Sequence, residues 1–300
     1  MADVNESLVV DNVVEQVGEA LRRLPDPHSL RDRGEFMTAG VDAMNSLLTL
    51  GKVAVCLQRP TGRGYTRRHA PLVGLVVRMV KLFEGILDQT VKDRGELAGV
   101  FIRPLYEAHI KFEYLMRSGP QSAKSFIITS FRPEKEMLVH LNSLKKQRPL
   151  QPIETRMRRS ILNHLKLVGL TQKQLFSQTR WDIDGKNMRS LLQVLHRDLE
   201  YSFSFGSSSH FVHGTWYDLW VYHLQRQKGR YHPDVRYTRP DPRYLISSTL
   251  ILTNSLTLFI RHFRVDPKGV LRQLIEAVWA YIGVFNDALE TVLAQEGSAT

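Results

Sequence analysis

Cysteine is nearly absent from this chain, which has a single one, Cys56, in 300 residues. One cysteine excludes an intramolecular disulfide framework and any zinc site built from several cysteines. The first 17 residues also lack the basic start and apolar run of a signal peptide, and they carry four acidic side chains instead. We therefore expect a cytoplasmic protein that needs no disulfide.

Long hydrophobic runs are missing as well. The longest uncharged stretch, residues 244–260, is slightly short for a membrane span and contains several serine, threonine and asparagine residues. We interpret it as a buried core helix rather than a membrane segment, and expect no membrane partner.

Acidic residues are few relative to basic ones: 30 Asp and Glu stand against 41 Lys and Arg, a formal net charge of +11. The surplus falls in three clusters in or beside loops, and in the third of them arginines alternate with tyrosines. Arginine forks suit phosphate oxygens, and interleaved aromatic rings can stack on bases. A solvated basic surface is the alternative. The candidate nucleic-acid contacts are Arg67, Arg68, Arg158, Arg159, Arg230, Arg236 and Arg239.

Apolar residues recur at three- and four-residue steps along most of the chain, which predicts helices. No segment alternates apolar and polar residues over a convincing strand length. We predict an all-α, bundle-like fold in one domain, with N-terminal helices and a basic loop in 1–69, a core in 70–264 and a C-terminal helix in 265–295. About nine to eleven helices are expected, over 8–24, 35–57, 70–91, 97–116, 121–147, 152–168, 172–177, 186–199, 207–224, 243–263 and 267–293.

The first candidate site pair is Arg103 and Glu107, which are four residues apart and so share one face of a predicted helix. Arg103 would keep the carboxylate ionised, or both side chains would face a ligand. The alternative is an ion pair within the helix that only stabilises the bundle.

The second candidate pair is Ser209 and His213, also at four-residue spacing. Such a pair can present a general base beside a hydroxyl or a bound substrate. His210 and His213 could in principle bind a metal, but no glutamate motif or cysteine accompanies them, so we expect neither a metal nor a cofactor. A structural role for each histidine is the alternative.

A third pattern places a histidine four to six residues after an arginine. This spacing is typical of the higher-eukaryote and prokaryote nucleotide-binding superfamily, a group of helical bundles that includes many ribonucleases. In RNA cleavage, arginine stabilises the phosphorane charge while histidine moves the 2′-hydroxyl proton. The pattern recurs often by chance in a chain rich in arginine. The pairs are Arg159 with His164, Arg103 with His109, and Arg189 with His196.

Two stretches together resemble a bacterial family catalogued as domain of unknown function five-six-seven-seven. They are Arg103-x-x-x-Glu107 followed by Tyr114-Leu115, and Tyr201 followed by Ser209-x-x-x-His213-Gly214. The resemblance covers residues 71–263 and implies a helical domain whose Arg/Glu helix packs near the Ser/His helix. It also implies, by analogy, a role in anti-phage defence. His210 and the long basic loop 225–242 depart from the family pattern.

These patterns predict a protein that binds or cleaves RNA or another phosphate-rich ligand. Arg103 would bind phosphate, Glu107 would orient Arg103 or His213, and His213 would be the acid and base. If the protein is an enzyme, it is a metal-independent, ribonuclease-like hydrolase or transferase. The alternative is a non-catalytic interaction protein whose basic loops dock a protein partner, a second copy or nucleic acid.

Overall fold

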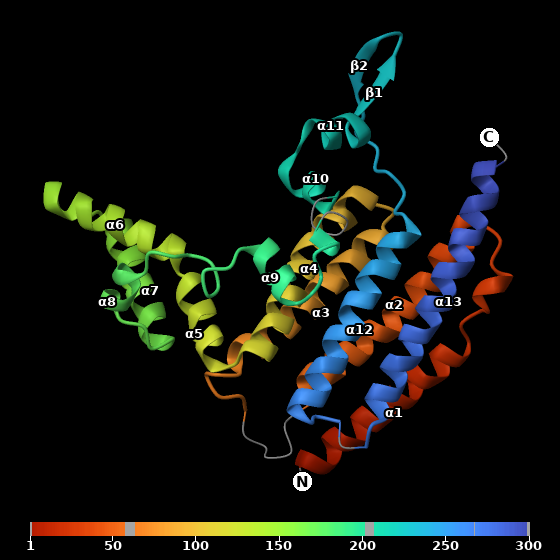
Figure 1. The fold of residues 1–300 in the computed structure, drawn as a ribbon, viewed down its shortest axis with the longest axis horizontal. Helices are drawn as coiled ribbons and strands as arrows, with labels where there is room; N and C mark the ends of the chain where they lie inside the picture. Colours follow the sequence, from red (N-terminus) through yellow and green to blue (C-terminus); the bar gives the residue numbers. More distant parts are fainter. Residues whose placement is uncertain (1, 58–63, 202–206, 267, 299–300) are drawn as a thin grey trace. The chain divides into compact units, whose positions relative to one another are not determined.

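The computed structural model describes residues 2–57, 64–201, 207–266 and 268–298, without the side chains of 2–9, 207–209 and 297–298. Within these ranges the chain forms thirteen α-helices, one turn of 3₁₀ helix (Pro27–Ser29) and a two-stranded hairpin (Figure 1). The predicted all-α fold class is confirmed.

The chain divides into two compact units. The first contains residues 1–64, 74–112 and 199–300, and the second contains residues 65–73 and 113–198. Two long helices, α3 (Ala70–Val91) and α4 (Gly95–Ser118), each contribute residues to both units.

The first unit is a helical bundle. In it α12 (Pro242–Phe263) packs against α2 (Arg33–Cys56) and α13 (Val270–Ser298), and α1 (Ala2–Arg22) packs against α2 and α13 (Figure 1). The hydroxyl of Ser255 on α12 contacts both α3 and α4. It lies 3.3 Å from the sulfur of Met79 on α3 and 2.8 Å from Nδ1 of His109 on α4. These contacts hold α4 in the bundle.

The uncharged stretch 244–260 is buried in α12, as predicted. Three of its buried hydroxyls are satisfied within the helix. The hydroxyls of Ser248, Thr253 and Ser255 donate to the carbonyl oxygens four residues earlier, at 2.6, 2.9 and 2.8 Å. A hydroxyl bonded in this way can be buried without an unsatisfied donor. Among the residues that the structure describes, no helix has both the length and the apolar character to cross a membrane.

The second unit has a smaller core formed by Leu138, Ile161, Leu165, Leu170 and Leu175. Its helices are α5 (Pro120–Thr129), α6 (Arg132–Gln147), α7 (Pro152–Leu167), α8 (Gln172–Ser177) and α9 (Met188–Val194).

Residue type explains the turn between α7 and α8. Gly169 follows α7 with a φ of 62°, in the left-handed region that favours glycine. Thr171 then caps α8 by accepting a hydrogen bond from the backbone N–H of Gln174 at 3.2 Å. Both features end one helix and start the next.

Two predicted helices are wrong because each is two helices. The predicted helix 121–147 stops after α5 and restarts at α6, where Pro133 in the first turn has no N–H to continue the earlier helix. The predicted helix 207–224 divides into α10 (Ser207–His213) and α11 (Trp216–Tyr222). Gly214 between them has a φ of 55°, and Thr215 caps the second helix.

The predicted loop 225–242 contains a hairpin, so the expectation of no strand is also wrong. Strands β1 (Leu224–Gln227) and β2 (Arg230–Pro233) pair antiparallel. The two-residue turn between them, Lys228 and Gly229, has φ values of 49° and 78°, which is the positive-φ geometry of a tight hairpin turn. The strands carry mostly polar residues, so apolar alternation could not reveal them.

The chain after the hairpin is fastened to the start of α4. The buried Glu96 carboxylate accepts hydrogen bonds from the N–H and the hydroxyl of Thr238, at 2.9 and 2.7 Å. The Gly95 N–H donates to the Thr238 carbonyl at 2.8 Å, an approach so close that an added Cβ at Gly95 would lie 2.9 Å from that oxygen. These bonds anchor the segment between the hairpin and α12 to the first turn of α4.

Candidate functional site

Arg103 and Glu107 lie together on α4, on the part of the helix that belongs to the first unit. Nε of Arg103 donates to Oε1 of Glu107 at 3.2 Å, and Lys111 one turn later lies 3.3 Å from Oε2. The two paired side chains are only 15% and 28% exposed, so solvent screens them less than a surface pair. Glu107 is therefore held between two cations and fixes the position of Arg103.

His213, the last residue of α10, is the third member of this cluster. Its Nε2 lies 2.9 Å from Nη1 of Arg103, although the two residues are 110 positions apart in the chain. A guanidinium can only donate, so Nε2 accepts and the imidazole is neutral with its proton on Nδ1. The structure thus brings Arg103, Glu107 and His213 into one hydrogen-bonded chain. Ser209 belongs to α10, but its side chain lies outside the described residues.

The contact between α10 and α4 depends on a glycine. Gly99 of α4 faces the ring of Phe211, and an added Cβ would lie 3.0 Å from three of its carbon atoms. Phe211 also contacts the rings of Tyr222 and Tyr244, at centroid distances of 5.3 and 6.0 Å. Burial raises the pKa of both tyrosines, so their hydroxyls stay protonated. This aromatic cluster seats α10 so that His213 reaches Arg103.

His210 has a different partner from His213. Its Nδ1 lies 2.8 Å from the hydroxyl of Thr215, and its ring packs on Tyr217 at a centroid distance of 4.8 Å. Because Thr215 also caps α11, His210 stabilises the turn between the two helices. Within the described part of the chain, no group of three or more His, Cys, Asp or Glu side chains could hold a metal ion.

The exposed aromatic surface of α11 was missed by sequence reasoning. Trp216, Tyr217 and Trp220 are 60%, 51% and 46% exposed, and Tyr231 of β2 is 47% exposed. The rings of Trp216 and Tyr231 meet edge to face at 5.7 Å, which joins the exposed rings of the helix to those of the hairpin. The ribbon of Figure 1 shows the hairpin directly after α11. The apolar spacing of this segment predicts burial, and only the density of aromatic residues signals an exposed site.

The hairpin gives this aromatic surface positive charge through Arg226, Lys228 and the predicted contact Arg230, all exposed. Two other predicted contacts have acidic neighbours. Asp234 accepts the backbone N–H of Arg236 at 3.1 Å and two bonds from its guanidinium at 3.0 Å each, and these bonds lower the pKa of that carboxyl. Arg239 is exposed and lies 4.0 Å from Asp93.

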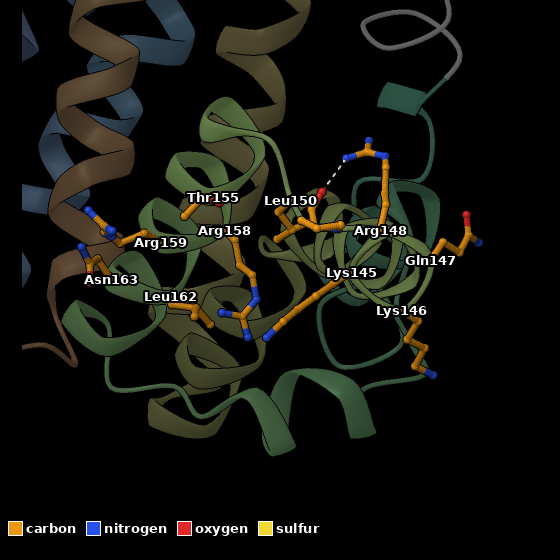
Figure 2. Close-up of a pocket in the computed structure, with 11 residues that line it drawn as sticks. Lys145, Lys146, Gln147, Arg148, Leu150, Thr155, Arg158, Arg159, Leu162 and Asn163 are labelled. Atoms are coloured by element: carbon orange, nitrogen blue, oxygen red, sulfur yellow. Dashed lines mark hydrogen bonds between the residues drawn. The ribbon is translucent and has the colours of Figure 1, made fainter.

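The remaining predicted contacts lie in the second unit. Arg67 is exposed and its guanidinium lies against Gly169 at the end of α7, while Arg68 is exposed nearby in the chain. Arg158 and Arg159 line a pocket beside α7, together with Lys145 and Arg148 (Figure 2). The structure therefore groups Arg158 and Arg159 with other cations.

The three arginine–histidine pairs do not form the expected sites. His109 is buried and hydrogen-bonded to Ser255 in the core. Arg159 and His164 are five residues apart on α7, which directs them to different faces of the helix. Arg189 is on α9, whereas His196 follows that helix in a left-handed conformation with a φ of 59°. The histidine that Arg103 contacts is instead the distant His213.

Comparison with known proteins matches residues 69–231 of this chain to the family of unknown function DUF5677. The chain belongs to this family. The resemblance noted from the sequence is therefore confirmed, and the matched DUF5677 region contains Arg103, Glu107 and His213. No curated protein and no solved structure matches the chain.

Proposed function

We propose that the protein binds RNA and cleaves it at the site formed by Arg103, Glu107 and His213. The observation that carries the proposal is the 2.9 Å contact between Arg103 and His213, which pairs a phosphate-binding cation with a neutral imidazole. These are the two groups that metal-independent RNA cleavage requires.

In the proposed reaction, a backbone phosphate takes the Nη1 hydrogen bond that His213 accepts in the free protein. The Nε2 lone pair is then free to remove the proton of the neighbouring 2′-hydroxyl. The 2′-oxygen attacks phosphorus, the bond from phosphorus to the 5′-oxygen breaks, and the leaving oxygen takes a proton from water. The hydroxide left behind takes the proton from Nε2 and restores the neutral imidazole of His213. Glu107 keeps Arg103 in place, and Arg103 stabilises the charge that builds on the phosphorane oxygens.

RNA is favoured over other phosphate ligands by the surface next to His213. Trp216, Tyr217 and Trp220 follow His213 in the chain and leave large ring areas exposed, and the hairpin beside them is basic. Exposed aromatic rings with nearby cations suit unpaired bases and the phosphates that join them. A role in anti-phage defence is an expectation from the family resemblance, and a cytoplasmic location is an expectation from the lone cysteine and the N-terminal sequence.

The test is cleavage of a labelled single-stranded RNA pool in EDTA by the wild type and three variants. We expect His213→Ala to lower the rate by about 10²-fold or more, as loss of a general base does. Arg103→Gln should lower it by about 10²-fold through lost charge stabilisation. His164→Ala is the matched control, because His164 is an exposed histidine of the second unit.

Products that end in a 2′,3′-cyclic phosphate would support the proposed chemistry. Equal rates in the wild type and His213→Ala, or no cleavage by the wild type, would overturn it. Circular dichroism melting of each variant separates a lost site from a lost fold.

The exposed rings of α11 also favour a second candidate, a non-catalytic protein that docks a partner or a second copy through this face. This function predicts an oligomer or complex that Trp216→Ser with Trp220→Ser dissociates, measured by light scattering. A wild-type monomer that cleaves RNA would count against it.

A further inference from the structure

A pocket of about 830 Å³ in the second unit lies where the end of α6 meets one side of α7. Five cations line it: Lys145, Lys146, Arg148, Arg158 and Arg159. In the described part of the chain, none of its lining residues is acidic. The pocket therefore concentrates positive charge in a hollow, where it attracts an anion more strongly than on an open surface.

One of the five cations already has an internal partner. Arg148 donates to both oxygens of Glu154, at 2.9 and 2.6 Å, and these bonds lower the pKa of that carboxyl to about 2. Glu154 also accepts the backbone N–H of Gln151 at 2.7 Å, as part of the capping box of α7. The charge of Arg148 is thus neutralised by Glu154, and its role in the pocket is structural.

The other cations that line the pocket have no acidic partner of this kind among the described residues. Among the described residues, no carboxylate forms an ion pair with Lys145, Arg158 or Arg159. Figure 2 shows the ends of Lys145 and Arg158 directed toward the same part of the pocket. Two like charges that converge repel each other, so an anion between them would be stabilised by both.

Arg158 adds a second, independent observation that points to a ligand. Its Nε is buried and has no hydrogen-bond partner. A buried N–H without an acceptor carries an unpaid desolvation cost, and native structures rarely leave one. A turn of the guanidinium toward a bound ligand would bring this N–H against a ligand oxygen and satisfy it.

We propose that this pocket binds a chain of phosphate groups, recognised through the phosphates alone. Arg158 would donate in its fork geometry to one phosphate, Lys145 would neutralise the next, and Arg159 with the amide of Asn163 would contact the rim. No aromatic side chain is among the residues that line the pocket, so it offers no stacking surface for a base. The site goes beyond the proposed cleavage and requires none of its residues.

The experiment is isothermal titration of the full chain with inorganic tripolyphosphate at low ionic strength. We expect the wild type to bind, and Arg158→Gln and Lys145→Gln each to weaken binding about tenfold, the loss of one charge-assisted hydrogen bond. Arg156→Gln is the matched control: Arg156 is on the same helix, is exposed and lies outside the pocket, and should change affinity less than about twofold.

Equal weakening by Arg156→Gln and Arg158→Gln would overturn the proposal, because it would show only general charge attraction. So would the absence of tripolyphosphate binding by the wild type. The melting temperature of Arg158→Gln should not fall, since Nε has no internal hydrogen bond to lose. The same titrations in the His213→Ala background separate this site from the proposed catalytic one.

Two sources of phosphate are distinguished by competition with a twelve-nucleotide single-stranded RNA. RNA that displaces tripolyphosphate from the wild type, and binds more weakly to Arg158→Gln, identifies an RNA backbone as the occupant. Tripolyphosphate that binds unaffected by RNA identifies a free polyphosphate. Either result supports a phosphate-chain site.

Discussion

Gly99 lets α10 pack closely on α4, and replacing it with alanine should move the two helices apart. The added methyl would lie 3.0 Å from ring atoms of Phe211, well inside an ordinary carbon–carbon contact. The ring has little room to move, because Tyr222 and Tyr244 pack against it. The strain is therefore relieved by shifting α10, and His213 moves with it.

Two opposing contributions set the size of the effect on stability. Alanine in place of a mid-helix glycine stabilises by about 1 kcal/mol. Overpacking costs about 1–3 kcal/mol. Gly74 of α3 is the matched control, because an added Cβ there meets nothing within 4 Å. Gly74→Ala should stabilise by about 1 kcal/mol, and Gly99→Ala should be about 1–3 kcal/mol less stable than Gly74→Ala.

Urea unfolding gives the two free energies, and ¹⁵N NMR of the imidazole shows whether Nε2 of His213 still accepts a hydrogen bond. We expect the Nε2 signal of Gly99→Ala to change, whereas that of Gly74→Ala should match the wild type. If Gly99→Ala is as stable as Gly74→Ala and its His213 signal is unchanged, the reasoning about this contact is refuted.

Three further predictions concern single side chains. The bonds from Arg148 lower the pKa of Glu154 to about 2. The contribution of Glu154 to the unfolding free energy is therefore full above about pH 4.5 and is lost as the pH falls toward 2. Glu154→Gln should remove this fall in the unfolding free energy, measured by urea unfolding across the same pH range. Burial raises the pKa of Tyr281 to about 12, so its contribution to the unfolding free energy is full below pH 10 and is lost between pH 10 and 12. An alkaline titration of tyrosine absorbance, with Tyr281→Phe as reference, checks this pKa. A midpoint near pH 10 contradicts it. Ser255→Ala should destabilise by about 1–3 kcal/mol in urea, because the buried His109 loses a partner at 2.8 Å, and a change under 0.5 kcal/mol would contradict this role.

The sequence predicted the long helices well because each has one continuous apolar face. Helix α3 has the predicted bounds, 70–91, and α12 begins one residue earlier than expected. The errors fall where apolar spacing continues through a break in the backbone. Gly214 and Thr215 interrupt such a pattern, and their turn chemistry outweighs the periodicity.

The candidate site was only half accessible to sequence reasoning. Arg103 and Glu107 interact across one helical turn, so their spacing was enough to pair them. The contact of Arg103 with His213 joins segments 110 residues apart and depends on how Phe211 packs on Gly99, which no local pattern encodes. The exposure of Trp216 also depends on distant parts of the chain. An apolar residue at helical spacing is predicted to be buried, and only the packing around its helix shows whether it is.

The region that identifies the family lacks the helices that bury one face of α3. The match covers 69–231, yet α2, α12 and α13, which pack on one another, all lie outside it. Met79 and Val80 of α3 are buried, and they lie against Ser255 of α12 and Gly51 of α2. A gene fragment cut at the limits of the match would leave that face of α3 in water and favour aggregation. The limits of the match therefore mark a shared sequence and not a folding unit, and expression of this protein calls for the flanking helices as well.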